Sequence, residues 1–340
     1  MLQSAGPRFL PVRDVSLALT FKLLSLLSHL EFRSGEDLAR QAGISRARVN
    51  QALRDAEALG VHLHRLPGRG YRLARPLSLL NAEIIESLLP PGQPFRVGVA
   101  DTLPSTSTAL LTALAAGEDI HGRVLAAEVQ SAGRGRMGRQ WVSRFGGSLT
   151  FSFGWRFERG ATALSGLSLA IGLALARGLE TLGYRELRLK WPNDLIHTHR
   201  KLGGVLLEVA GDALGPSTVV VGIGINVVLP AAARVDIPQA VVDLTELAPE
   251  PPERNRLLAA LLAELAPTCQ RFASEGFAGF AQEWQERHAY HGRAVRLAEP
   301  GGGSCEGVVE GVDESGALLL TTGGSMRSVL AGEISLRRVP

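Results

Sequence analysis

Cysteine, lysine and aromatic residues are scarce in this chain of 340 residues. It has only two cysteines, Cys269 and Cys305, so a disulfide framework is excluded and a reducing cytoplasm is expected. No secretory signal is recognisable, because the apolar run after Val15 is interrupted by Lys22 and lacks a small-residue cleavage site. The charge-free apolar stretch at residues 160–176 is shorter than the ~20 residues of a membrane span. We therefore expect a folded cytoplasmic protein outside the membrane, with this stretch as a buried helix.

Lysine is rare relative to arginine, since 33 of the 36 basic residues are arginine and only Lys22, Lys190 and Lys201 are lysine. A retained lysine therefore indicates a place that needs a compact ammonium rather than a planar fork. Two of the three lie in one segment, LKWPNDLIHTHRKLGG, which becomes a candidate site. Chance is the alternative explanation, because three residues are too few to exclude it.

Acidic residues are scarce at the N-terminal end. Residues 1–76 carry 12 basic and 6 acidic residues, a balance of +6, whereas residues 77–340 have a balance of −3. This asymmetry favours an anionic partner for the N-terminal unit, nucleic acid before a membrane surface. A solvated basic face without a partner is the alternative.

The N-terminal unit has the pattern of a winged helix-turn-helix. Apolar residues recur at helical spacing over residues 15–30, and Ser34 with Asp37 forms a capping-box pair before a second helix. Gly43 ends that helix and Ser45 can cap a third. Two short helices around a glycine turn are typical of this motif.

A hairpin wing is expected after Gly60, where VHLHRL and YRLAR alternate around a turn with a basic tip. The side chains expected to contact DNA lie at the start of the third helix and at the wing tip: Ser45, Arg46, Arg48, Asn50, Gln51 and Arg69. A helical interaction module without a DNA role is the alternative.

The rest of the chain has the pattern of an α+β body. Strands are expected at residues 97–100, 124–129, 148–155, 187–190, 204–209 and 219–225. Helices are expected at residues 107–116, 161–182 and 254–275. Strand runs with inserted helices indicate a mixed or antiparallel sheet. Short strands after residue 286 predict a small β-barrel of about 50 residues. The predicted domains are therefore residues 1–76, 77–286 and 287–340.

A glycine loop, QSAGRGRMGR at residues 130–139, is the first candidate ligand-binding segment. It contains the pattern G-x-G-x-x-G, but a dinucleotide fold needs a helix directly after the glycines, and here a strand follows. What remains is a flexible loop whose Arg134, Arg136 and Arg139 suit phosphate or carboxylate. Such a loop can order over an anionic ligand. A solvated basic loop is the alternative.

Three further segments place polar groups at the ends of predicted strands. PSTST at residues 104–108 opens a helix and can hold an anion or a neutral polar head group, although such residues are also common helix caps. Residues 189–204 bring together two lysines, an aromatic, an asparagine, an aspartate and a glycine pair. GIGIN at residues 222–226 is a strand that ends on an amide.

Together these segments resemble one family. QSAGRGRMGRQW, KWPNDL, RKLGGVLLE and GIGIN are signature segments of biotin–protein ligases, and SGEDLARQAGISRARVNQALR is similar to the variant that doubles as the biotin operon repressor. The resemblance runs from about residue 15 to residue 337. It implies an α+β multidomain protein: a winged-helix DNA-binding domain, a central mixed-sheet ligase domain related to class II synthetases and lipoate ligases, and a C-terminal SH3-like β-barrel.

The resemblance implies a two-step reaction with biotin, ATP and Mg²⁺. Biotin attacks the α-phosphate of ATP to give biotinyl-5′-AMP and pyrophosphate, and a lysine of the biotin carboxyl carrier protein of acetyl-CoA carboxylase then displaces AMP. The implied catalytic residues are Lys201, Arg136, Lys190 and Asp194. The implied biotin-binding residues are Ser105, Thr106, Ser107, Gln130, Arg134, Gly135, Arg136 and Lys201. The implied ATP-binding residues are Arg136, Arg139, Trp141, Lys190, Asn193, Asn226 and Arg337.

The resemblance also implies individual roles. Lys201 would lie between the carboxylate and the phosphate, and Trp141 would face the adenine. Asp194 has two open roles, to orient or deprotonate the acceptor lysine or to bind magnesium, and no residue is assigned as a certain metal ligand. The chain departs from the commonest pattern at Ser107, where Asn is frequent, and at Met137, where a further Arg is often found. Neither change removes a group that the reaction needs.

The implied partners are the carrier protein, operator DNA and a second copy of the chain. One winged helix reads a short half-site, so paired half-sites require a homodimer, which we expect biotinyl-5′-AMP to promote. A lipoate–protein ligase-like enzyme is opposed by the winged helix and the AGRGR loop. A repressor with a dead enzyme site is opposed by the intact lysines and loop arginines. A third alternative, a ligase whose N-terminal domain no longer binds DNA, is not opposed by any feature of the sequence.

Overall fold

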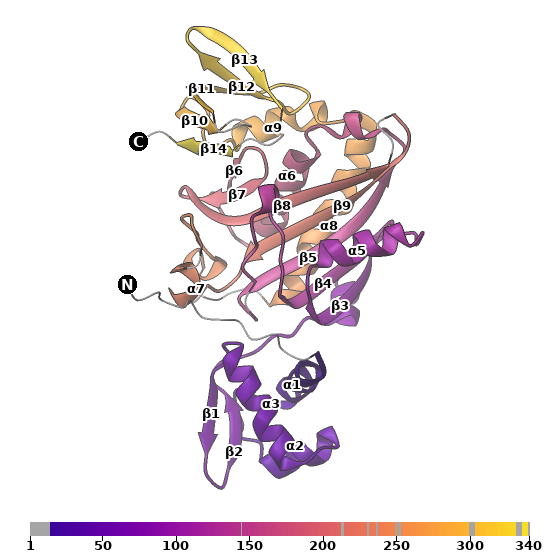
Figure 1. The fold of residues 1–340 in the computed structure, drawn as a ribbon, viewed down its shortest axis with the longest axis vertical. Helices are drawn as coiled ribbons and strands as arrows, with labels where there is room; N and C mark the ends of the chain where they lie inside the picture. The colour runs from indigo at the N-terminus through magenta and orange to yellow at the C-terminus, as the bar shows by residue number, and fades with distance from the viewer. Residues whose placement is uncertain are drawn as a thin grey trace, which may run out of the picture. The chain divides into compact units, whose positions relative to one another are not determined.

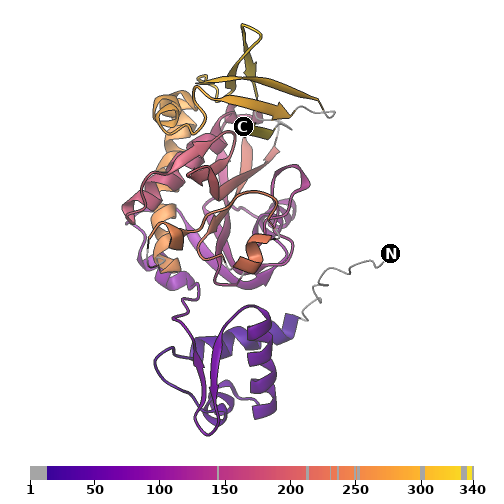
Figure 2. The ribbon, with the colours of Figure 1, turned by 90° about the vertical axis from the view of Figure 1, so that its left-hand side faces the viewer.

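The computed structural model describes residues 14–143, 145–211, 214–229, 231–235, 237–248, 250, 253–298, 303–330 and 335–338. The chain forms two compact units, Met1–Leu79 and Leu80–Pro340. Figures 1 and 2 show the helices and hairpin of the first unit and the central sheet of the second.

The first unit consists of three helices and a hairpin, which confirms the predicted motif. Its elements are α1 (Asp14–Leu26), α2 (Gly35–Ala42), α3 (Arg46–Ala58), β1 (Leu63–Leu66) and β2 (Gly70–Leu73). The predicted caps are present: Ser34 Oγ accepts from the Asp37 N–H at 3.0 Å, and Ser45 Oγ accepts from the Arg48 N–H at 3.4 Å. Gly43 ends α2 with φ 71°, a left-handed conformation that suits glycine.

The wing of this unit bonds back to the helical part through its backbone. The helix predicted over residues 15–30 stops with α1, because the Ser28 carbonyl instead accepts from the Leu73 N–H at 2.9 Å. Gly70 has φ 102°, and a Cβ there would lie 2.0 Å from the Arg33 carbonyl oxygen. Only glycine therefore permits this close approach of β2 to the chain before α2.

A seven-stranded mixed sheet forms the centre of the second unit (Figure 1). Its strands are β3 (Arg96–Leu103), β4 (Arg123–Gln130), β5 (Ser148–Phe157), β6 (Arg188–Lys190), β7 (Asp194–His197), β8 (Arg200–Gly211) and β9 (Ser217–Asn226). The order is β3-β4-β5-β9-β8-β7-β6, with β3 and β4 parallel and the other neighbours antiparallel. The six predicted strands and the mixed sheet are confirmed. β7 is not predicted, because it is short and lies in the polar segment after Lys190.

The helices of the second unit are α4 (Ala82–Ser87), α5 (Thr106–Ala115), α6 (Leu167–Thr181), α7 (Ala231–Val235), α8 (Arg254–Glu275) and α9 (Ala281–Glu286). The prediction of one helix over residues 161–182 is wrong at its start. Ala161–Leu164 form a separate 3₁₀ turn, and Gly166 has φ 78° where a Cβ would lie 2.6 Å from Phe277. Residues 161–181 are long and apolar enough to cross a membrane, but 67% of the most apolar window is buried inside the fold, as in a core helix.

Alternation along β5 and β9 separates two buried faces of the sheet. Odd-numbered residues such as Phe151 and Val221 belong to the main core, which also contains the buried residues of α6 and α8. Val220 instead joins Leu110 of α5 in a second cluster, and Ser152 is one of the small or polar even-numbered residues. Successive side chains of a strand point to opposite faces, so α5 covers the face opposite to α6 and α8.

The segment predicted as a small β-barrel forms a small antiparallel sheet. Its strands are β10 (Ala294–Ala298), β11 (Ser304–Val312), β12 (Leu318–Thr322), β13 (Ser325–Val329) and β14 (Ser335–Arg338), in the order β13-β12-β11-β10-β14. It is bonded to the larger sheet's loops: Trp191 Nε1 donates to the Gly316 carbonyl at 3.1 Å, and Ser165 Oγ donates to the Ser315 carbonyl at 2.7 Å. The small sheet therefore contacts the turn that follows β6.

Candidate active site

A cavity of about 750 Å³ lies on the α5 side of the large sheet. Its lining brings together residues that the sequence analysis singled out: Ser105, Thr106, Ser107, Gln130, Arg134, Gly135, Arg136, Arg139, Trp141, Lys190, Asn193, Asp194, Lys201 and Asn226. Arg337 lies on β14, where its backbone pairs with Arg296 of β10, and its contact with ATP stays a prediction.

One end of the cavity is a cluster of buried hydroxyl groups at the start of α5. The N–H and hydroxyl of Thr106 donate to Gln130 Oε1 at 2.7 and 3.2 Å. The hydroxyls of Thr106 and Ser107 lie 2.7 and 2.9 Å from Ser152 Oγ on β5. Ser105, Thr106 and Ser107 are at most 4% exposed. This end therefore offers hydrogen bonds rather than charge, which suits a neutral polar ligand group.

The two glycines of GIGIN leave room for the cavity. A Cβ at Gly222 would lie 2.5 Å from Ser107 Oγ, and a Cβ at Gly224 would lie 2.4 Å from the Trp141 ring. Both residues lie on the α5 face of β9, because they share the parity of Val220. The isoleucines of this segment therefore pack in the core on one face of β9, and the glycines leave the other face open to the cavity.

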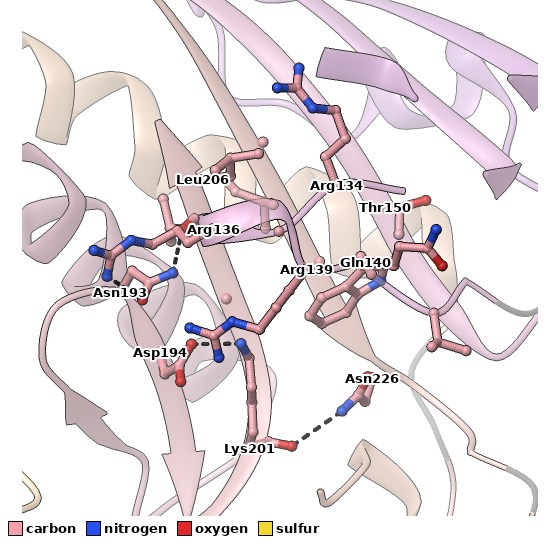
Figure 3. A pocket seen from close by; sticks show the side chains of 18 of the residues that line it. Arg134, Arg136, Arg139, Gln140, Thr150, Asn193, Asp194, Lys201, Leu206 and Asn226 are labelled. Atoms are coloured by element: carbon pink, nitrogen blue, oxygen red, sulfur yellow. Dashed lines mark hydrogen bonds and ion pairs between the residues drawn. The ribbon is translucent and has the colours of Figure 1, made fainter. Parts of the chain in front are cut away.

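Lys201 and Asp194 form an ion pair in the cavity wall (Figure 3). Lys201 Nζ lies 2.6 Å from Asp194 Oδ1, and the two side chains are 17% and 14% exposed. The ammonium also lies 5.7 Å from the centroid of the Trp141 ring. A Cβ at Gly204 would lie 3.0 Å from Nζ, so there is little space around it. A compact cation is therefore held between a carboxylate, an indole and the β8 backbone.

Arg136 is directed toward Asn193 (Figure 3). Its Nη1 donates to Asn193 Oδ1 at 3.3 Å, and Asn193 Nδ2 donates to the Val205 carbonyl at 2.7 Å. Burial lowers the pKa of Arg136, the nearby Asp194 opposes this shift, and Arg139 adds to it. A partly desolvated guanidinium interacts more strongly with an anion than one in open water. Arg136 is thus a preset cation for an anionic ligand.

Arg134 and Arg139, unlike Arg136, contact protein groups other than Asn193. Arg134 Nη1 lies 2.7 Å from Glu208 Oε1, and Figure 3 shows its side chain pointing away from the Lys201–Asp194 pair. Arg139 Nη2 donates to Met137 Sδ at 3.7 Å. Contact of Arg134 with a ligand therefore requires it to leave Glu208, and its assignment stays a prediction.

Trp141 and Asn226 flank the ion pair. Among the described residues, Trp141 Nε1 is buried and has no hydrogen-bond partner. A buried unpaired donor costs about 1–3 kcal/mol, and a bound ligand is one source of an acceptor. Asn226 Nδ2 donates to the carbonyls of Lys201 at 3.2 Å and Val242 at 3.1 Å, so the amide ties the end of β9 to the start of β8.

Family models match the chain in three places. Residues 20–72 match an HTH domain, residues 99–226 the biotin/lipoate A/B protein ligase family, and residues 290–337 the biotin protein ligase C-terminal domain. The chain is 39% identical to the bifunctional ligase/repressor BirA of Escherichia coli, over 93% of this chain and 96% of that protein. The chain belongs to the bifunctional ligase/repressor family. The chain is also 36% identical to the biotin–[acetyl-CoA-carboxylase] ligase of Mycobacterium tuberculosis, over 68% of this chain and 85% of that protein.

The fold of the chain agrees with this membership. It is similar to a solved biotin protein ligase from Aquifex aeolicus in complex with biotin and ATP, with a TM-score of 0.62 and 29% identity. The match covers 72% of this chain and 99% of that chain. The central and C-terminal parts of the chain therefore have the fold of biotin protein ligases.

The residues predicted to contact DNA lie on α3 and the wing. Five of them are exposed: Ser45, Arg46, Arg48, Gln51 and Arg69. Ser45 caps α3. Asn50 is half-buried, and its Oδ1 accepts a hydrogen bond from the hydroxyl of Tyr71. Asn50 therefore joins the helix to the wing, and its predicted contact with a base requires this bond to break.

The cavity residues that the sequence analysis missed include Ser152, His199 and Tyr290. The alternation of SLTFSFGWRF carries a signal for Ser152, because its large apolar residues occupy one face and place Ser152 on the other. His199 and Tyr290 have no such signal. Their rings are parallel within 5° at 6.1 Å, but they come from chain segments far apart in sequence.

Proposed function

We propose that this protein activates biotin with ATP, transfers it to a lysine of biotin carboxyl carrier protein, and represses biotin-synthesis genes as an operator-bound homodimer. The observation that carries the proposal is the cavity itself, where the hydroxyl cluster, the Lys201 ammonium and the Arg136 guanidinium line one space. Biotin-dependent exchange of pyrophosphate into ATP tests the first step. Exchange that requires biotin is expected, and a folded protein without exchange contradicts the assignment.

The hydroxyl end supports biotin rather than lipoate as the substrate. The ureido group of biotin has N–H donors and a carbonyl acceptor, which match the buried groups of Thr106, Ser107 and Gln130. Lipoate has no such group and would leave these buried polar atoms without partners, which a site of this kind rejects strongly. The 39% identity to a bifunctional ligase/repressor over 93% of the chain also favours biotin.

The first step brings two anions together. A biotin carboxylate oxygen forms a bond to the α-phosphorus of ATP, and the bond from that phosphorus to the pyrophosphate oxygen breaks. We assign Lys201 to the space between carboxylate and α-phosphate, and Arg136, Lys190 and Asn193 to the phosphates. Preset cations lower this barrier by electrostatic stabilisation and positioning.

The second step needs a neutral amine. The acceptor lysine nitrogen bonds to the biotinyl carbonyl carbon, the bond from this carbon to the AMP oxygen breaks, and the amine loses its proton. Asp194 is the one carboxylate among the described residues that line the cavity, so we assign the orientation or deprotonation of the acceptor lysine to it.

Magnesium would bind with ATP and neutralise part of the phosphate charge. Mg²⁺ typically takes one or two protein carboxylates together with substrate phosphates, and Asp194 fits this requirement. In the part of the chain that the structure describes, no group of three or more His, Cys, Asp or Glu side chains forms a dedicated metal site. The ion would therefore enter with its nucleotide.

Gly222→Ala is expected to raise the KM for biotin about 2- to 10-fold, the effect of losing one net hydrogen bond. The new Cβ would lie 2.5 Å from Ser107 Oγ, so Ser107 must move away from Ser152. Steady-state pyrophosphate exchange at varied biotin measures this. Gly98→Ala is the matched control, because its Cβ would make only ordinary contacts at 3.6 Å. Equal KM values for the two variants would rule out the hydroxyl end as the biotin site.

Biotinyl-5′-AMP is expected to strengthen dimerisation. We propose that the AGRGR loop folds over the adenylate and favours the dimer, which by linkage must then bind the adenylate more tightly than the monomer does. Ordering the loop costs about 1–2 kcal/mol per residue, which its contacts to the adenylate offset. Analytical ultracentrifugation with and without biotinyl-5′-AMP measures the coupling. A monomer–dimer constant that the adenylate leaves unchanged contradicts it, while the ligase assignment stands.

We also propose that the protein is a cytoplasmic enzyme and that its three domains are residues 1–76, 77–286 and 287–340. A ligase whose N-terminal unit no longer binds DNA is the alternative. The exposed Arg46, Arg48 and Arg69 favour the repressor, because they suit contact with phosphates and bases.

A further inference from the structure

Tyr290 contacts two other residues of the cavity wall. It is 5% exposed and lies between α9 and β10, where the match to the C-terminal domain begins. The Lys190 ammonium is 6.0 Å from the centroid of its ring, and the imidazole of His199 lies parallel to the ring at 6.1 Å. All three side chains line the cavity. The C-terminal domain therefore supplies a buried aromatic ring to the ligase site.

His199 is held in an uncommon backbone conformation. Thr198 has φ 45° and His199 has φ 65°, the left-handed region that residues with side chains seldom adopt. These two residues make the tight turn between β7 and β8. A two-residue loop between antiparallel strands favours such positive φ values, so the hairpin itself fixes the position of His199. Here the turn places an exposed imidazole against the Tyr290 ring.

Lys190 and the hydroxyl cluster lie at opposite sides of the cavity floor. The cluster involves Ser152 on β5, whereas Lys190 ends β6, and three strands lie between them. At about 4.8 Å per strand the two ends are roughly 19 Å apart. Lys201, at the start of β8, lies between them. With biotin at the cluster and the α-phosphate at Lys201, the β- and γ-phosphates extend toward Lys190.

We propose that Tyr290 and His199 are positioning residues that hold the Lys190 ammonium toward the pyrophosphate part of ATP. The inference rests on the proposed function of the cavity. The face of the Tyr290 ring attracts the ammonium and limits the conformations of a flexible side chain. His199 stacks on the ring and restricts it in turn. The C-terminal domain thereby contributes to ATP binding through Lys190, in addition to the predicted contact of Arg337 with ATP.

The test measures the KM for ATP and for biotin and the kcat of pyrophosphate exchange in four variants of the full-length protein. Tyr290→Leu removes the ring and is expected to raise the KM for ATP roughly 3- to 30-fold, the range of a cation–π contact, with the KM for biotin unchanged. Tyr290→Phe keeps the ring, so the KM for ATP of this variant is expected to equal the wild-type value. His199→Ala, at an exposed position, is expected to give a smaller rise in the same constant, which His199→Phe reverses.

A double-mutant cycle with Lys190→Ala separates positioning from a structural effect. If Tyr290 acts through Lys190, Tyr290→Leu has no further effect on the KM for ATP in the Lys190→Ala protein. Additive effects, or a KM for ATP that stays at the wild-type value in both Tyr290→Leu and His199→Ala, overturn the inference. Wild-type protein without biotin-dependent exchange would instead overturn the proposed function, so the two failures are distinguishable.

Discussion

Lys201→Arg is expected to reduce the rate of biotinyl-5′-AMP formation by about 10²- to 10³-fold, the usual effect of removing one preset electrostatic contact. Arginine keeps the charge but is larger and planar. The ammonium of Lys201 lies 2.6 Å from Asp194, and a Cβ at Gly204 would be only 3.0 Å from it. A guanidinium cannot occupy this space without displacing the β8 backbone or the carboxylate.

Lys22→Arg is the matched control, since it makes the same change in the N-terminal unit, where Lys22 Nζ donates to the Ala42 carbonyl at 3.2 Å. Single-turnover formation of the adenylate, followed by rapid quench, measures the rate for both variants, and circular dichroism checks the fold. A Lys201→Arg rate within about threefold of the wild-type rate would remove the assigned role.

Removal of residues 1–76 is expected to abolish DNA binding and to leave the ligase active. The start of the second unit is anchored within that unit: the Leu80 N–H donates to Glu128 Oε1 at 2.6 Å, and the Asn81 N–H donates to Asn255 Oδ1 at 2.7 Å. These bonds do not depend on the deleted part. The basic surface of α3 and the wing is lost completely.

Fluorescence anisotropy on a duplex selected by the full-length protein from a random pool measures this DNA binding. For the full-length protein, log affinity should fall linearly with log salt concentration, because Lys and Arg displace counterions from phosphates. DNA binding that survives the deletion, or that is indifferent to salt, contradicts the winged-helix assignment. Loss of adenylation in the deletion variant would show that the two units are not functionally separable.

Local rules made much of this structure predictable. Hydroxyl side chains of Ser34 and Ser45 cap α2 and α3 as their spacing indicates. Alternation in β5 and β9 places apolar residues in the core and leaves hydroxyls and glycines for the site. The candidate site was predictable because its residues cluster in short segments at strand ends, such as KWPNDL.

Contacts between distant segments were not predictable. Gly166 precedes α6 in a left-handed conformation and packs against Phe277, which lies more than a hundred residues away. Similarly, Tyr290 reaches Lys190 because the backbone of Arg287 and Ala289 bonds to Leu189 of β6. Hydrophobic periodicity does not predict such pairs, because it describes only the residues within one local segment.

Mass spectrometry of a biotin carboxyl carrier protein incubated with this protein, biotin and MgATP tests the central claim most directly. The account predicts the addition of one biotinyl group to a single lysine of the carrier, dependent on both biotin and ATP. It also predicts that omission of the carrier leaves biotinyl-5′-AMP bound to the protein. A carrier that stays unmodified in the presence of folded full-length protein and both substrates would contradict the account.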